Sequence, residues 1–568
     1  MRSQLFDGDP AARREGHPVT ALPLAAPDRW LLRACLWLPL TALLLFFAVP
    51  MGFVAWRSLM QDDGGIGFAN YVALLDTPGV WQATQNSLVL GLATTAITLL
   101  LAFVLAYGME RTCMRGRRLV AAALTLPMLA PSLVLGLGLI FILGRNGIVG
   151  KLLDIRPDIY GFSGLLIADV LYALPQAVLI LRAALRCADA RQYEAAEVLG
   201  ATPWRQFRDI TLPAMRYGLL SAAFVVFTVT ITDFGNAVVI GGDFAVLATE
   251  IYNQVSGQMR FGIGAVVGLL LLLPAALSVW IERVAAQRRA GIGAESARPP
   301  EPQPSHRRDG VYALLCLGIA GAICAVVATV IVAGFIRLWP YRLDLTFKHY
   351  DITVSGGYAS LWASLAVSLL AAAVGTGLLF LLAFSLRRLS GWPARAATLL
   401  ATLPVGVPGL VLGLAYVFAF NEPSLPWAAL YGGVFLLAMC NFYHYHTQGY
   451  VTMATGLRTV PTQLEEAVTV LGGGVGRLLA DVHLPALRVT LLAVAAFLFM
   501  RSMVTLSAVI FLVTPELSLS AVTVMRLDEA GFTSQAAAFS TCIMAVVGTV
   551  ALLLHRLTAD RPARAIIK

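Results

Sequence analysis

Residues 194–213 read E-A-A-E-V-L-G-A-T-P-W-R-Q-F-R-D-I-T-L-P, and residues 466–485 read E-A-V-T-V-L-G-G-G-V-G-R-L-L-A-D-V-H-L-P, 272 positions later (194 to 466). Each copy predicts a short helix, a glycine break and a second short helix that ends at Leu-Pro. In the first copy, Trp204 and Phe207 have the spacing of an apolar stripe on the second helix. A surface element of this kind can dock into a groove of a partner protein.

The composition around these two copies is that of a membrane protein. Of the 568 residues, 58% are hydrophobic and 13% are charged, and the mean hydropathy is +0.77. This charge content excludes a soluble enzyme, a disordered scaffold and a nucleic-acid-binding module. We predict an all-α polytopic membrane protein with about twelve spans. They cover residues 34–56, 86–109, 119–143, 164–185, 217–240, 261–281, 311–336, 361–386, 396–420, 428–450, 489–513 and 532–555.

The basic residues predict the orientation of these spans. If the N-terminus is cytoplasmic, 31 Lys and Arg residues fall on the cytoplasmic side, 9 fall outside, and Arg501 lies within a span. Because basic residues collect on cytoplasmic loops, the bias places both termini in the cytoplasm. The predicted cytoplasmic tails are 1–33 and 557–568. The run after Arg29 is too long for a signal-peptide core and is predicted to be a retained first span.

An internal repeat divides the chain into two six-span halves. Residues 284–310 are rich in Pro, Gly, Ala and Arg and are predicted to be a cytoplasmic linker between domains 34–283 and 311–556. T-L-P-M-L-A-P-S-L-V-L-G-L (125–137) matches T-L-P-V-G-V-P-G-L-V-L-G-L (402–414) at nine of thirteen positions. The shared prolines and glycines predict two similarly bent helices. Since each half has six spans, the repeat is parallel, and the pathway should lie between the halves.

The chain lacks the residues for binding ATP itself. Lys151, Lys348 and Lys568 are the only lysines in the sequence, and none is followed by Ser or Thr after a glycine, as a P-loop requires. The seven cysteines are scattered, and we interpret them as buried apolar side chains instead of disulfides or metal ligands. We therefore predict that no cofactor is bound by this chain and that any ATP is bound by another subunit.

The two opening sequences resemble the EAA loop of ABC importer permeases, E-A-A-x3-G-x9-I-x-L-P. The positions that match in the first copy are Glu194, Ala195, Ala196, Gly200, Ile210, Leu212 and Pro213. Those that match in the second are Glu466, Ala467, Gly472, Leu484 and Pro485. Val468 and Val482 replace an alanine and the isoleucine, and the Gly472–Gly474 run is expected to loosen the second helix. We call 194–213 and 466–485 the first and second coupling loops.

The resemblance covers nearly the whole chain, which is most similar to the fused ferric-iron, thiamine and 2-aminoethylphosphonate permeases. It implies that each coupling loop docks on a cytoplasmic ATPase subunit, so that two copies bind one chain. It also implies a periplasmic substrate-binding protein as partner and a multi-pass location in the bacterial inner membrane. The chain itself would not be an enzyme, and it shows no nucleophile elbow and no H-E-x-x-H motif.

Polar residues inside the predicted spans are candidates for contact with the substrate, because they are costly in a bilayer. They are Asp169, Asp233, Asn441, His444 and Arg501. His444 and His446 stand two residues apart on a helix, which points them to different faces and disfavours a shared metal ion. Each of these residues could instead form an internal contact that has no role in transport.

The sequence leaves three alternatives for the substrate. Residues 231–274 are most similar to permeases for 2-aminoethylphosphonate, a zwitterion that Asp233 and Arg501 would suit. Ferric iron and thiamine are the alternatives within the same group. A different class, a secondary transporter driven by an ion gradient, also fits a parallel six-plus-six repeat, but it does not explain the coupling loops.

Overall fold

The computed structural model describes residues 26–61, 64–155, 157–290, 298, 300–353, 356–389 and 391–559. Most of the predicted N-terminal tail (1–25), part of the linker (291–297 and 299) and residues 560–568 of the C-terminal tail lie outside the described residues. Several helices extend beyond the predicted apolar stretches into the predicted tails and linker. α1 begins at Ala26, α14 ends at Ala290 and α24 ends at Ala559. Long basic side chains can continue a helix past the bilayer core.

The first half is almost entirely helical. Its elements are α1 (Ala26–Leu43), the π-helix η1 (Leu44–Ala48), α2 (Val49–Leu59), α3 (Ala69–Leu75), α4 (Pro78–Arg111), α5 (Arg117–Leu129), α6 (Leu133–Leu143), α7 (Ile148–Leu153), α8 (Phe162–Arg186), α9 (Ala190–Val198), α10 (Pro203–Gln206), the π-helix η2 (Phe207–Thr211), α11 (Leu212–Thr232), α12 (Gly235–Ile240), α13 (Leu247–Tyr252), the π-helix η3 (Asn253–Gly257) and α14 (Phe261–Ala290).

The second half follows the same plan and adds one small sheet. Its elements are α15 (His306–Phe335), β1 (Ile336–Leu338), β2 (Arg342–Leu345), the 3-10 helix η5 (Lys348–Tyr350), α16 (Gly357–Leu386), α17 (Gly391–Thr402), the 3-10 helix η7 (Leu403–Gly406), α18 (Gly409–Phe420), the 3-10 helix η8 (Ala428–Leu430), α19 (Val434–Arg458), α20 (Thr462–Val470), α21 (Val475–Arg477), the π-helix η9 (Leu478–His483), α22 (Leu484–Val504), α23 (Ser520–Glu529) and α24 (Thr533–Ala559). β1 and β2 pair antiparallel, with Ile336 opposite Leu345.

The all-α membrane fold is confirmed, and helices lie at each of the twelve predicted spans. Within the described residues, ten helices are long and apolar enough to cross a membrane, or eleven with one bent pair. The predicted tenth span is present as α19, a helix of 25 residues. It does not count among the apolar helices because polar and aromatic residues, Asn441 to His446, occupy its middle.

The helices that carry the repeated prolines are broken in both halves. In the first half, α5 and α6 are separated at 130–132. In the second, the stretches Gly391–Gly406 and Gly409–Phe420 are bent by 108°. Pro131 and Pro408 each lie at the break, where proline removes a helical hydrogen bond. The repeat therefore places a break of the helix at equivalent positions of the two halves.

The element boundaries confirm the repeat from α8 onward. A shift of 272 residues carries the bounds of α8 onto α19, α9 onto α20, and α11 onto α22 without a change in length. The predicted spans 217–240 and 489–513 are wrong at their ends, because α11 and α22 stop at Thr232 and Val504. Hydropathy does not detect these ends, since apolar residues continue past them.

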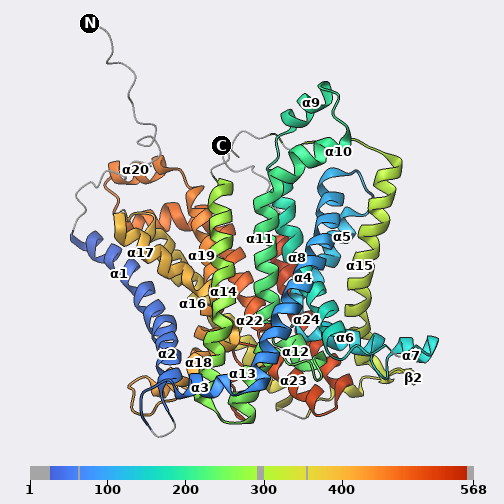
Figure 1. Ribbon diagram of the computed structural model, residues 1–568. Helices are drawn as coiled ribbons and strands as arrows, with labels where there is room; N and C mark the ends of the chain where they lie inside the picture. Colours follow the sequence, from blue (N-terminus) through green and yellow to red (C-terminus); the bar gives the residue numbers. More distant parts are fainter. Residues whose placement is uncertain are drawn as a thin grey trace.

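The first helix of each half packs on the other half (Figure 1). α15 packs on α5 and α6 of the first half as well as on α24, while α1 and α2 pack on α16 and α18 of the second half. The Tyr416 hydroxyl of α18 donates to the Phe46 carbonyl of η1 at 2.6 Å. One buried apolar core accordingly contains residues of both halves, such as Leu133, Val326 and Phe442.

Candidate functional site

The two coupling loops lie at the same end of the bundle, which we call the coupling end (Figure 1). α9, α10 and α20 project from this end, at the top of the view. Each loop consists of a nine-residue helix, a glycine and a short helix that passes through a π turn into the next long helix. π turns are uncommon and are found frequently at functional sites.

The glycine of each loop ends the first helix as predicted. Gly200 and Gly472 have φ of +71° and +72°, a conformation that side chains rarely adopt. The N–H groups of Gly200 and Ala201 donate to the carbonyls of Glu197 and Ala196, both at 2.9 Å. The second loop repeats this double hydrogen bond, which satisfies the last carbonyls of a helix.

The glycine run of the second loop does not change its geometry. A Cβ at Gly473 would lie 2.6 Å from the Val468 side chain, and one at Gly474 would lie 2.5 Å from Asp28 Oδ1. Asp28, on α1, accepts a hydrogen bond from the Val475 N–H at 2.9 Å. The second loop therefore keeps the geometry of the first, and Gly473 and Gly474 each accommodate a close contact.

Each loop exposes an apolar tip. Val198 and Leu199 are 89% and 85% exposed, and the equivalent Val470 and Leu471 are 83% and 82% exposed. Trp204 is also exposed, and its ring stacks on Phe207 at 5.5 Å between centroids. Large apolar side chains that are exposed together are typical of a surface that binds another protein.

The remaining motif residues lie on or beside this surface. The exposed ones are Glu194, Ala195, Leu212, Pro213, Glu466, Ala467, Leu484 and Pro485. Ala196 and Ile210 are half-buried against the bundle. Pro213 and Pro485 lie just after the π turns η2 and η9 within a continuous helix, where a proline removes one helical hydrogen bond.

A cavity of about 200 Å³ lies between the halves. Its walls come from α8, α11 and the chain after α11 in the first half, and from α19, α22 and the chain after α22 in the second. The break of the proline-containing helix in the second half, Val405 to Gly409, closes one side. The cavity lies between the halves, with walls from both, which is where the repeat predicts a pathway.

Equivalent residues of the two halves face each other across this cavity. A shift of 272 relates the lining residues Tyr172 to His444 and Gln176 to Gln448. The same shift relates Asp233 to Thr505, and Val229 to Arg501. The two charged residues therefore break the symmetry, because Asp233 and Arg501 each correspond to an uncharged residue in the other half.

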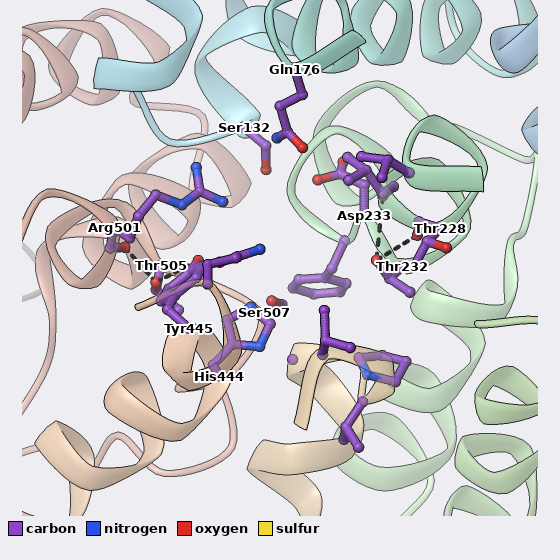
Figure 2. Close-up of a pocket in the computed structure, with 18 of the residues that line it drawn as sticks. Ser132, Gln176, Thr228, Thr232, Asp233, His444, Tyr445, Arg501, Thr505 and Ser507 are labelled. Atoms are coloured by element: carbon purple, nitrogen blue, oxygen red, sulfur yellow. Dashed lines mark hydrogen bonds between the residues drawn. The ribbon is translucent and has the colours of Figure 1, made fainter. Parts of the chain in front are cut away.

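Asp233 and Arg501 lie on opposite sides of the cavity, and the Arg501 guanidinium points into the space between them (Figure 2). Asp233 follows the last residue of α11, and its Oδ2 accepts the Asn236 N–H at 2.9 Å. Arg501 lies over the Tyr445 ring, 4.8 Å from its centroid. Within the described part of the chain, no ion pair joins either group to an opposite charge.

Two of the predicted pathway residues lie behind the cavity wall. Asp169 on α8 is buried and accepts a hydrogen bond from Asn236 Nδ2 at 2.9 Å. Asn441, at the equivalent position of α19, donates to Ser502 Oγ at 2.8 Å. Neither residue lines the cavity. Asp169 instead holds Asn236, whose backbone N–H binds Asp233, so that its contact with the pathway is indirect.

The two histidines of α19 have different surroundings, as their spacing predicts. His444 lines the cavity. His446 is buried, with its ring stacked on Tyr443 at 5.5 Å between centroids. The two side chains are therefore not placed to share one ion.

Sequence reasoning missed several polar residues of the cavity. Gln176, Gln448, Tyr172 and Ser132 line it together with Ser507. A signal for the first two was present, because glutamine recurs at the offset of the coupling loops within two largely apolar helices. Apart from Asn441 and His444, the predicted candidates were charged residues, although uncharged polar side chains can also bind a polar substrate by hydrogen bonding.

Each half contains a tight contact between a glycine and a serine at the cavity wall. A Cβ at Gly235 would lie 2.1 Å from Ser132 Oγ, and one at Gly409 would lie 2.3 Å from Ser507 Oγ. Ser132 corresponds to Gly409, and Gly235 to Ser507, so the glycine and serine exchange places between the halves. The contact joins the broken helix of each half to the chain after α11 or α22.

We expect Gly409→Ala to destabilise the protein, because its Cβ would also lie 3.1 Å from the Ala508 backbone nitrogen. Overpacking of this kind costs about 1–3 kcal/mol, which thermal unfolding in detergent would measure as a lower Tm. Gly377→Ala on α16 serves as the control and should not lower the Tm, because a Cβ there would meet nothing within 4 Å. A Tm for Gly409→Ala equal to that of the wild type would contradict the tight contact.

Residues 99–291 and 372–564 each match the family described as binding-protein-dependent transport system inner membrane component. The chain belongs to this family. It is a fused permease with two copies of the family domain, and it spans the membrane several times as the permease of a bacterial ABC importer.

Curated relatives of this permease carry several substrates in their names. The ferric transport system permease protein FbpB of Actinobacillus pleuropneumoniae is 25% identical over 95% of this chain and 80% of its own length. The thiamine transport system permease protein ThiP of Brucella abortus is 28% identical over 53% of this chain and 58% of its own length. The molybdenum transport system permease protein ModB of Azotobacter vinelandii is 32% identical over 31% and 81%.

Proposed function

We propose that this permease forms the membrane pathway of an ATP-driven importer for a small zwitterion, with 2-aminoethylphosphonate as the specific substrate. The observation that carries the proposal is the cavity between the halves, in which Arg501 and Asp233 lie on opposite walls. A phosphonate would bind the arginine, which holds oxyanions through its planar fork of donors. An ammonium group would bind the carboxylate.

The coupling end faces the cytoplasm in this proposal. Two copies of an ATPase subunit, which bind and hydrolyse ATP, dock on the apolar tips of the first and second coupling loops. A periplasmic binding protein delivers substrate at the opposite end. The halves 34–283 and 311–556 act as the two permease domains, and both termini are cytoplasmic, in agreement with the distribution of basic residues.

Ferric iron is the second candidate, because the relative FbpB matches nearly the whole chain. The cavity argues against the passage of a bare ferric ion. Arg501 places a positive charge on its wall, and like charges repel strongly where water is scarce. Within the described residues there is no group of three or more His, Cys, Asp or Glu that could hold a metal ion. Thiamine, a cation, would also be repelled by Arg501.

Ligand binding to the partner binding protein tests the substrate. We expect titration calorimetry to show binding of 2-aminoethylphosphonate and no binding of ferric ion or thiamine. Uptake by proteoliposomes that hold the permease and its ATPase should then require both ATP and that ligand. Ferric binding without 2-aminoethylphosphonate binding would overturn the substrate. Uptake that persists without the ATPase and is abolished with the ion gradient would instead support a secondary transporter.

A further inference from the structure

Three residues anchor the first coupling loop to the bundle. The guanidinium of Arg111, the last residue of α4, lies 5.0 Å from the ring centroid of Tyr193 on α9. Arg111 also donates to the Leu185 carbonyl at 2.9 Å. The Tyr193 hydroxyl shares a hydrogen bond of 2.8 Å with Thr211 Oγ1 in the π turn η2. Arg111 is the only charged member of this anchor.

The second loop has the same anchor with different chemistry. The repeat places Glu465 where the first half has Tyr193, and His483 where it has Thr211. Glu465 Oε2 accepts from Arg388 Nη2 at 2.6 Å, and Oε1 lies 3.4 Å from Arg387 Nη2 and 3.3 Å from His483 Nε2. The side chains of Glu465 and His483 are 8% and 0% exposed. A buried carboxylate thus joins α16, α20 and the π turn η9.

The first half has an ionic cluster too, but it does not include the coupling loop. Glu110 on α4 binds Arg182 at 2.7 Å and Arg186 at 2.8 Å, both on α8. In the second half, Arg387 occupies the position of Glu110. The carboxylate of the ionic cluster therefore has a different place in each half. In the first half it joins two long helices, and in the second it joins the end of a long helix to a coupling loop.

We infer that the second coupling loop is held by an ionic anchor centred on the buried carboxylate of Glu465, that the first is held by an anchor that contains no carboxylate, and that the two loops therefore respond unequally to the ATPase. Glu465 is a positioning residue, since it acts through the loop and not on the substrate. It is distinct from the adjacent Glu466, which matches the motif but is exposed. The functional half of the inference rests on the proposed ATPase docking.

The ionisation of Glu465 supports a charged anchor. Burial raises the pKa of its carboxyl, but the nearby His483 ring and the charges of Arg388 and Arg387 together outweigh burial and lower it below its ordinary value. The carboxyl is thus ionised at neutral pH. A buried ion pair that loses one partner leaves an uncompensated charge, whereas a lost neutral hydrogen bond has a smaller effect.

Hydrogen–deuterium exchange on the purified permease, without the ATPase, tests the anchors. We expect Glu465→Gln to speed exchange in residues 462–483 by about 100-fold, the effect of breaking a buried pair. Tyr193→Phe removes only a hydroxyl, and exchange in 190–211 should rise by about 10-fold or less. Glu422→Gln, which removes an exposed carboxylate from the loop that follows α18, is the control and should change neither segment.

A matched double variant separates positioning from general destabilisation. Glu465→Tyr with His483→Thr copies the side chains of the first anchor, and we expect it to restore the exchange in 462–483 to the level of the first loop. If Glu465→Gln does not fold, His483→Gln tests the same contact more mildly. Equal effects of Glu465→Gln and Tyr193→Phe on their own loops would overturn the inference, and so would an unchanged second loop.

Reconstitution with the ATPase subunit that co-purifies with the wild type tests the functional half. We expect Glu465→Gln to lower the substrate transported per ATP hydrolysed about 10-fold more than Tyr193→Phe does. Equal losses in the two variants would overturn the unequal response. If the exchange results hold but no ATPase binds either loop, the anchors stand and the proposed function fails. The two failures are therefore distinguishable.

Discussion

Arg501→Ala is expected to lower substrate uptake at least about 30-fold, because losing one partner of a desolvated charge contact costs about 2–5 kcal/mol. The guanidinium points into the cavity and has no carboxylate partner within the described residues, so its charge is available to an anionic group of the substrate. Uptake of radiolabelled 2-aminoethylphosphonate by proteoliposomes would measure the loss. ATP hydrolysis measured without substrate should remain, since the coupling loops are unchanged.

Two further variants make this test specific. Arg501→Lys keeps the charge but loses the planar fork and the contact over Tyr445, so we expect an intermediate loss. Arg488→Ala removes an exposed arginine from the other end of the same helix and is the matched control. Uptake by Arg501→Ala at the level of this control would exclude Arg501 from the pathway.

Leu199→Asp combined with Leu471→Asp is expected to abolish binding of the ATPase subunit. Both side chains lie at the exposed tips of the coupling loops, so the substitutions should leave folding intact. Each would place a charge in a docked interface, where an unpaired carboxylate is strongly unfavourable. Co-purification of the ATPase and ATP hydrolysis by the complex would measure the loss, and each single variant should retain part of the binding.

The same substitution elsewhere provides the control. Leu345 on β2 is 82% exposed, which matches the loop leucines, but it lies at the other end of the molecule (Figure 1). Leu345→Asp should therefore leave ATPase binding unchanged. Full binding by the double loop variant would show that the ATPase docks on another surface.

Much of this architecture could be predicted from the sequence because the two halves of the chain repeat the same motifs. The repeated prolines predicted two bent helices, and the coupling loops predicted two short helices separated by a glycine. The ends of α11 and α22 were not predicted, since hydropathy continues past Thr232 and Val504. The structure places Asp233 directly after the end of α11, where it lines the cavity.

Other features depend on contacts that no linear pattern contains. Asp169 and Asp233 both carry a carboxylate in an apolar stretch, yet one lies behind the wall and the other on it, because Asn236 stands between them. The motif likewise selects Glu466, while the buried neighbour Glu465 makes the ionic contacts. Such distinctions depend on the rotation of a helix against its neighbours, which spacing along one chain does not determine.

The first helix of each half packs on the other half, and this arrangement limits how the halves can move. Because α1 and α2 pack on the second half and α15 packs on the first, each half is held by the first helix of the other. A transport cycle that pulled them apart would have to strip these helices from their partners and expose apolar surface. A change in the access to the cavity that keeps these contacts would involve rotation of one half relative to the other, with α1, α2 and α15 still packed in place.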